Sequence, residues 1–179
     1  MPEMVKVGIS LGVDCLPATW GVHSKFRDSK ANNYNTCPFD LMISNFDGVV
    51  KCLLEDFQHF TDPAHLVYDG ISIRNTYYKF VFNHETPGHA NLHITEQWEE
   101  GINHFVNNKF KNFIERYNTR ITNFRNYLNN ADNFINFIYH PSSETPNYSA
   151  LKAALLSKYP NLQYKIHIIN GPLPHNVMS

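Results

Sequence analysis

The last third of the chain places a helical segment between two apolar runs, and this order constrains the fold more than any other feature. Residues 134–139 and 162–169 have the apolar composition of strands, and residues 146–159 between them have that of a helix that Pro160 would end. Two strands joined by one helix are most simply a right-handed βαβ crossover, which makes the two strands parallel. We therefore expect an α/β fold with a parallel βαβ core.

The start of the chain predicts another strand, followed directly by a turn and a helix. Apolar and small or polar residues alternate from Val5 to Leu11, which is the period of a strand. Asp14 can cap a helix over 15–26 whose first turn tolerates Pro17. Cys15 would then lie at a strand-to-helix turn, beside backbone N–H groups that have no helical partner.

A thiol at such a turn is placed to react. Helix N-termini favour the thiolate form of cysteine, and the same N–H groups can hold an oxyanion. We expect the amide of Cys15 and one more amide from the turn at Gly12 to act as these donors. The alternative is that Cys15 is only a small buried residue.

The middle of the chain predicts a helix and a β-hairpin. Ser44 and Asp47 form a capping box, and an apolar stripe at helical spacing follows over 45–58. Asp69-Gly70 supplies a two-residue turn between short apolar runs. The next predicted strand, 77–82, leads into a loop that is rich in histidine.

A long helical pattern follows from Thr95 to Leu128, with an apolar residue every three or four positions. A continuous helix of this length would span about 50 Å at 1.5 Å per residue, more than a domain of this size usually does. We expect a break near Asn118-Thr119. Together these elements predict one α/β domain over 1–179, with a mixed sheet, a parallel βαβ core, flanking helices and a β-hairpin.

Composition excludes several classes of protein. The 179 residues carry a net charge of −1 and a pI near 6.8, which does not favour a nucleic-acid-binding surface. No run of eighteen apolar residues and no signal-peptide pattern is present, so we expect neither a membrane span nor secretion. Three cysteines without CxxC spacing fit reduced thiols in the cytoplasm. No cofactor is predicted, because Gly12 alone is not a phosphate-binding loop.

The histidine-rich loop suggests a second chemistry, a metal site. His84, His89 and His93 lie within ten residues, with Glu85 among them, and three imidazoles can hold Zn²⁺. Their spacing matches no defensible motif, so no metal site is predicted. The remaining histidines considered are interpreted as surface or packed residues: His59, His65, His104, His167 and His175.

The order of three motifs resembles a known family. Ser10-Leu11-Gly12-x-x-Cys15 is followed by Pro38-Phe39-Asp40 and by a later strand that leads to a histidine. This order resembles the family of unknown function described as putative papain-like cysteine peptidases, although Leu41 stands where that family has tryptophan. The resemblance implies a cysteine-dependent hydrolase or acyl transferase that acts on an amide, ester or thioester of a small molecule or peptide, with an α+β papain-like fold as the alternative architecture.

The resemblance assigns Cys15 as the nucleophile and asks for a histidine that takes the thiol proton. His84, which follows a strand, is the histidine we select, and His140, which ends a core strand, is its chief rival. The alternative function is a non-enzymatic binding module, or a degenerate enzyme, in which Cys15 is structural.

A third group would fix the orientation of the imidazole. We select Asp40 for this role, with Asn83 and Glu85 as alternatives. Asp40 could equally be a carboxylate that ties its own loop or caps a helix.

Overall fold

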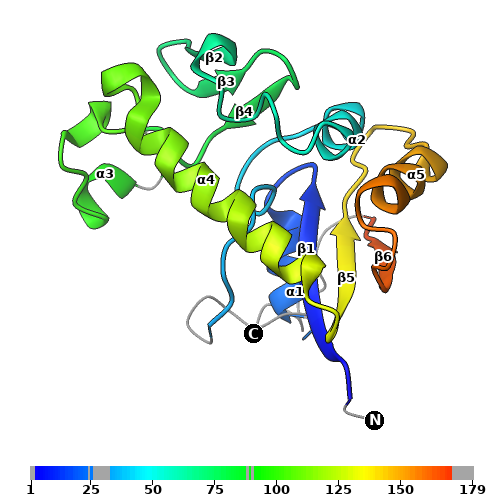
Figure 1. The fold of residues 1–179 in the computed structure, drawn as a ribbon. Helices are drawn as coiled ribbons and strands as arrows, with labels where there is room; N and C mark the ends of the chain where they lie inside the picture. Colours follow the sequence, from blue (N-terminus) through cyan, green and yellow to red (C-terminus); the bar gives the residue numbers. More distant parts are fainter. Residues whose placement is uncertain (1–2, 24, 26–32, 88, 90, 171–179) are drawn as a thin grey trace.

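The computed structural model describes residues 3–23, 25, 33–87, 89 and 91–170. Strands β1 (Val5–Gly12), β5 (Asn133–Tyr139) and β6 (Tyr164–Ile168) form a parallel sheet in the order β1-β5-β6. Strands β2 (Leu66–Tyr68), β3 (Ile73–Asn75) and β4 (Phe80–Phe82) form a separate antiparallel sheet. The predicted α/β class is confirmed, with its parallel and antiparallel strands divided between two sheets (Figure 1).

The predicted βαβ unit is present as β5, helix α5 (Tyr148–Lys158) and β6. In the register, Phe137 of β5 lies opposite Ile9 of β1 on one side and Ile166 of β6 on the other. Ile9 and Phe137 are fully buried, as expected for the middle of a parallel sheet covered by helices.

Helix α2 (Phe46–Leu54) packs against α5, as Figure 1 shows beside the parallel sheet. The predicted cap was wrong by one residue. Asn45 is the N-cap, because its side-chain oxygen accepts a hydrogen bond from the Gly48 amide at 2.7 Å. The amide of Ser44 donates instead to the carbonyl of Val13 at 2.6 Å, which ties this segment to the end of β1.

The predicted hairpin is present as β2 and β3, and Asp69 organises its turn by accepting hydrogen bonds from the amides of Ile71 and Ser72. The strand predicted at 77–82 is shorter, since residues 76–79 form a turn before β4. Asn75 accounts for that turn, because its side-chain oxygen accepts from the amides of Tyr77 and Tyr78.

The long helical pattern is broken, but earlier than predicted. It consists of α3 (Leu92–Thr95), a 3₁₀ turn over Gly101–Asn103, and α4 (Asn107–Asn129). Within α4, residues 108–110 have left-handed backbone angles, and the predicted break near Asn118 lies inside regular helix. The buried face of α4 has the predicted helical spacing: Phe113, Tyr117, Ile121, Phe124 and Leu128.

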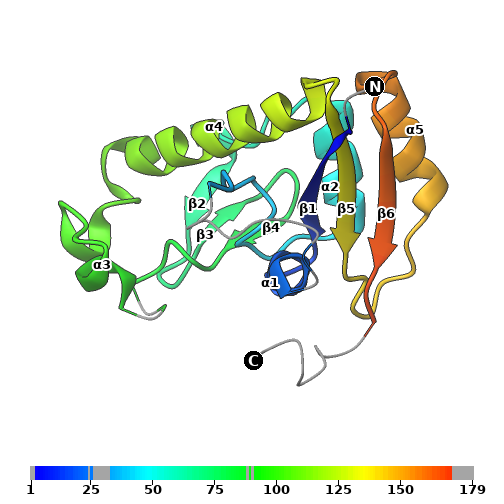
Figure 2. The ribbon, with the colours of Figure 1, turned by 90° about the horizontal axis from the view of Figure 1, so that it is seen from below.

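Helix α1 (Leu16–His23) follows β1 and packs on β1 and β5. It corresponds to the start of the helix predicted over 15–26, of which residues 24 and 26 lie outside the described part. Figures 1 and 2 show α3 well separated from α1, at the end of the molecule away from α5 and β6.

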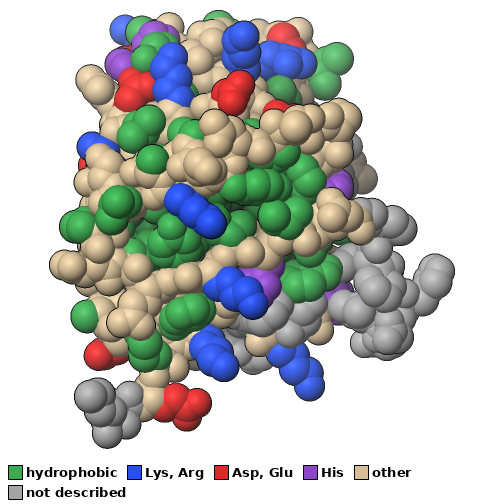
Figure 3. Space-filling model, turned by 90° about the vertical axis from the view of Figure 1, so that its right-hand side faces the viewer, with side chains coloured by type: hydrophobic (Ala, Val, Ile, Leu, Met, Phe, Trp, Pro, Cys, Tyr) green, Lys and Arg blue, Asp and Glu red, His purple; other side chains and the backbone are tan. Residues whose placement is uncertain are grey.

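The side of the molecule that carries α5 and β6 presents hydrophobic side chains among lysine and arginine residues (Figure 3). Leu156 of α5 and Ile168 of β6 are among the exposed large hydrophobic residues. Within the described ranges, no helix has the length and apolar character needed to cross a membrane.

Candidate active site

The site lies where β1 and β5 end side by side. The amide of His140 donates to the carbonyl of Gly12 at 2.8 Å, and the amide of Val13 donates to the carbonyl of His140 at 3.2 Å. The two segments that follow β1 and β5 therefore stay paired just beyond the strands. Because the strands are parallel, the turn that carries Cys15 and the residue His140 share one sheet edge, which is where α/β proteins bind ligands.

Asp14 connects the start of α1 to His140. One carboxylate oxygen accepts a hydrogen bond from the amide of Leu16, the first residue of α1, at 3.0 Å. The other oxygen lies 3.3 Å from Nδ1 of His140, whose side chain is 17% exposed. A carboxylate at Nδ1 fixes the orientation of the imidazole. Sequence reasoning missed this role of Asp14, which depends on a contact across 126 positions of the chain.

Cys15 differs from the other two cysteines in being exposed. Cys37 and Cys52 are buried, and burial raises the pKa of the Cys52 thiol well above its usual value. Cys15 directly precedes α1, and its carbonyl accepts the helical hydrogen bond from the amide of Thr19. An exposed thiol at the start of a helix can meet a substrate from solvent.

The second predicted oxyanion donor, an amide from the turn at Gly12, stays a prediction. The amide of Gly12 donates to Oγ of Ser10, and that of Val13 donates to His140, so neither is free. The amide of Cys15 has no acceptor among the residues whose positions the structure describes. It remains available as a donor.

The Ser10-Leu11-Gly12 motif and the Pro38-Phe39-Asp40 motif, which are far apart in sequence, are in direct contact. Ser10 is fully buried, and its hydroxyl donates to the carbonyl of Phe39 at 3.3 Å while accepting from the amide of Gly12 at 3.1 Å. The Pro38-Phe39-Asp40 segment therefore supports the turn that leads to Cys15.

Asp40 is buried within its own loop. Its Oδ2 accepts hydrogen bonds from the Tyr34 hydroxyl at 3.0 Å and from the Cys37 amide at 2.8 Å. These contacts tie residues 34–40 together. They match the loop-tying alternative weighed for Asp40.

His84 lies between β4 and α3, where its ring centre is 4.0 Å from that of His89. Burial lowers the pKa of His84 to about 4, and the nearby positive charges of Arg120 and Arg116 add to this effect. Among the described residues, no hydrogen bond joins His84 to Cys15. Because its pKa is lowered to about 4, His84 is a neutral imidazole at pH 7, and two arginine side chains lie near it.

Glu85 anchors the same loop to α4. Its buried carboxylate accepts from the Tyr117 hydroxyl at 3.1 Å and forms ion pairs with Arg120 at 3.3 Å and Arg116 at 3.2 Å. Burial raises the pKa of Glu85, and both arginines and Tyr117 oppose that rise. Asn83, the other alternative, accepts a hydrogen bond at its backbone carbonyl from the Thr86 hydroxyl.

The alternative metal cluster does not assemble in the described part of the chain. His93 lies in α3 with its ring centre 6.2 Å from that of Trp98, and Glu85 is already occupied by α4. His84 and His89 are adjacent, but they gather no third ligand there.

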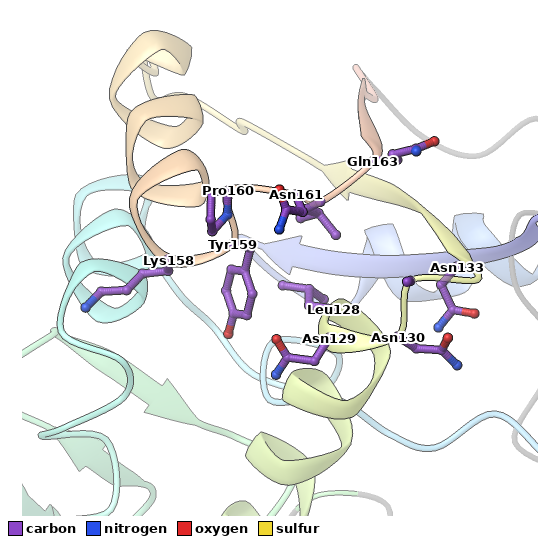
Figure 4. A pocket seen from close by; sticks show the side chains of 11 residues that line it. Leu128, Asn129, Asn130, Asn133, Lys158, Tyr159, Pro160, Asn161 and Gln163 are labelled. Atoms are coloured by element: carbon purple, nitrogen blue, oxygen red, sulfur yellow. The ribbon is translucent and has the colours of Figure 1, made fainter.

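Several hollows lie apart from Cys15. The first, about 230 Å³ in volume, is lined by the ends of α4 and α5 and by the segments that lead into β5 and β6 (Figure 4). It therefore lies at the amino ends of the parallel strands, whereas Cys15 lies at their carboxyl ends. The second, about 750 Å³ and open, lies between residues 33–36 and α4.

Comparison with known proteins identifies the family. Residues 6–171 match the model of the family described as putative papain-like cysteine peptidase. The chain belongs to this family. No curated protein and no solved structure matches the chain. Family membership supports a hydrolase of the cysteine peptidase type, and it leaves the substrate and the residue roles to be tested.

Proposed function

We propose that this member of the papain-like cysteine peptidase family is a cysteine-dependent hydrolase or acyl transferase that acts on an amide, ester or thioester. Cys15 is the nucleophile, His140 is the general base and Asp14 orients the imidazole. The observation that supports this assignment is the Asp14 carboxylate, which contacts both the start of α1 and Nδ1 of His140.

In the proposed reaction, His140 takes the proton of the Cys15 thiol, and the thiolate attacks the carbonyl carbon of the substrate. The amide of Cys15 stabilises the resulting oxyanion. The tetrahedral intermediate then collapses to a thioester, and the leaving group takes the proton from His140. Water or a second nucleophile attacks the thioester and releases the acyl group, which restores the thiol.

His140 is better supported than His84 as the base, because the base must become positively charged. Asp14 places a carboxylate beside His140, whereas burial, His89, Arg120 and Arg116 all lower the pKa of His84 and so disfavour its charged form. Sequence reasoning had selected His84 and retained His140 as its rival.

The orienting role predicted for Asp40 stays a prediction. Its hydrogen bonds to Tyr34 and Cys37 support a structural role.

The three free cysteines support a cytoplasmic location, where thiols stay reduced.

Alkylation of Cys15 tests the assignment directly. Wild-type protein is treated with iodoacetamide between about pH 5 and pH 9, and the rate at Cys15 is followed by mass spectrometry. We expect His140→Ala to slow this rate at pH 7 by at least about tenfold, with recovery at high pH, where the thiol ionises without a base. Asp14→Asn should slow it in the same direction.

His84→Ala serves as the matched control and should leave the rate at Cys15 unchanged. A loss of rate in His84→Ala but not in His140→Ala would assign the base to His84. An unchanged rate in both variants would instead indicate a non-enzymatic protein in which Cys15 is structural. A panel of acyl and peptidyl electrophiles, compared between wild type and Cys15→Ala, would then define the substrate class.

A further inference from the structure

A group of metal-ligating side chains lies between α2 and β2, away from the proposed active site. His59, Asp62 and His65 each offer one ligand atom, and these three atoms lie within 4.8 Å of one another. In the part of the chain that the structure describes, this is the group of three or more such residues that converges. Sequence reasoning had assigned both histidines to the surface or to packing.

A short turn brings Asp62 and His65 together. Oδ1 of Asp62 caps the 3₁₀ helix Pro63–His65 by accepting from the Ala64 amide at 2.9 Å. Its Oδ2 lies 4.0 Å from Nε2 of His65. One carboxylate oxygen therefore holds the backbone while the other faces the imidazole, where it can bind an ion.

One ring nitrogen of His59 has a carboxylate partner, and the other has no hydrogen-bond partner in the described structure. Its Nε2 lies 3.5 Å from the Glu55 carboxylate, and the Tyr77 hydroxyl donates to the same carboxylate oxygen at 2.9 Å. Nδ1 of His59 is buried and has no hydrogen-bond partner in the described structure. A carboxylate at one ring nitrogen fixes the tautomer and strengthens the other nitrogen as a metal ligand.

The two imidazoles share one aromatic support. The ring centre of Tyr77 lies 4.3 Å from that of His59 and 5.0 Å from that of His65. The Lys51 ammonium lies over the Tyr77 ring, 3.8 Å from its centre. Glu55 and Asp62 supply two negative charges against it.

We propose that His59, Asp62 and His65 form a binding site for a first-row divalent cation, with Zn²⁺ as the best match. Two imidazole nitrogens and one carboxylate oxygen form a donor set that Zn²⁺ accepts, whereas Ca²⁺ and Mg²⁺ favour oxygen ligands. Ligand atoms around tetrahedral Zn²⁺ are about 3.4 Å apart. Side-chain rotations that move each ligand atom by about 1 Å therefore complete the site. A water molecule takes the fourth position, because all three side chains are partly exposed.

The proposed ion would connect the end of α2 to the start of the antiparallel sheet. Glu55 directly follows α2, and His65 directly precedes β2. The expected effect of binding is therefore on stability, and the site does not depend on the chemistry proposed for Cys15.

Equilibrium dialysis against Zn²⁺ followed by elemental analysis tests the site, using the full chain in a Cys15→Ser background so that the exposed thiol binds no metal. We expect one Zn²⁺ per chain and at least a tenfold loss of affinity in His59→Gln, Asp62→Asn and His65→Gln. Asp62→Asn is the mildest of these, because asparagine keeps the capping oxygen and removes the charge.

The double variant His84→Gln/His89→Gln is the matched control, because it removes the other adjacent pair of imidazoles. It should retain the bound Zn²⁺ and the rise in Tm that Zn²⁺ produces. Binding that survives all three site variants, or that is lost only in the control, would overturn the proposal. Far-UV circular dichroism confirms that each variant is folded, and Asp62→Asn decides the test if a histidine variant is not.

Discussion

The close approach of Gly12 to Ser44 leads to a testable prediction about the turn before Cys15. Gly12 has φ of +107°, a conformation that residues with side chains rarely adopt. A Cβ atom at this position would clash with Oγ of Ser44. Gly12→Ala therefore introduces two separate costs, backbone strain and a steric clash.

The two costs can be estimated and separated. The strained backbone costs about 1–3 kcal/mol and the overpacking about 1–3 kcal/mol, so we expect Gly12→Ala to lose about 4 kcal/mol of the free energy of unfolding. Ser44→Ala removes a buried hydroxyl that has no partner in the described structure, so it should change stability by less than about 0.5 kcal/mol. The double variant loses the clash and keeps the strain, so it should recover about 2 kcal/mol.

Urea unfolding followed by far-UV circular dichroism measures all three variants. Gly70→Ala is the matched control, because Gly70 has φ of +92° and nothing within 4 Å of the added Cβ, so it reports the strain alone. If Gly12→Ala and the double variant were equally stable, Ser44 would not press on this turn, and the reasoning would be refuted.

Three further predictions concern single side chains. Burial lowers the pKa of His84 from its ordinary value of 6.5 to about 4 in the folded protein. The unfolded chain therefore binds more protons between these values, and stability falls as the pH falls from about 6.5 toward 4. His84→Gln should flatten that part of the profile in urea unfolding at several pH values, and an unchanged slope would contradict this. Asp40→Asn weakens the bonds that hold Tyr34 and the Cys37 amide, and should cost about 1–3 kcal/mol by the same assay. It should leave the alkylation rate of Cys15 unchanged, and a large fall in that rate in a stable variant would support the orienting role instead. Glu144→Gln should cost about 1 kcal/mol, because the carboxylate accepts from the Phe46 amide at the N-terminus of α2, and thermal unfolding without loss of Tm would argue against this contact.

Local patterns in the sequence were enough to predict most of the elements. The apolar runs around the α5 segment predicted β5 and β6, and Pro160 marked where the helix stops. The break in the long helix could not be placed in this way. Residues 108–110 adopt left-handed angles, which asparagine tolerates at position 108 but which Lys109 and Phe110 disfavour, so the local pattern does not predict the break.

The candidate site was predictable only in part. Cys15 followed from the strand, the cap and the motif, and each of these is local in sequence. The contact between Asp14 and His140 required the order of the strands, since β1 and β5 are more than a hundred residues apart. The loop at His84 contains several histidines, but the pKa of His84 is lowered first by burial and then by His89 and by Arg120 and Arg116 on α4, and local patterns do not reveal the burial or the two arginines.

The charges around the two candidate bases have opposite signs, and this separates the two histidines further. A base that takes the thiol proton works as part of a thiolate–imidazolium pair, so its surroundings must stabilise positive charge. The Asp14 carboxylate, 3.3 Å from Nδ1 of His140, supplies a negative charge there, and replacing it by asparagine should weaken the pair. The arginines near His84 have the reverse effect, so removal of Arg120 should raise the pKa of His84 without changing the reactivity of Cys15. If the reactivity of Cys15 rose together with the pKa of His84, the two residues would be coupled, and His84 would have to be reinstated as the base.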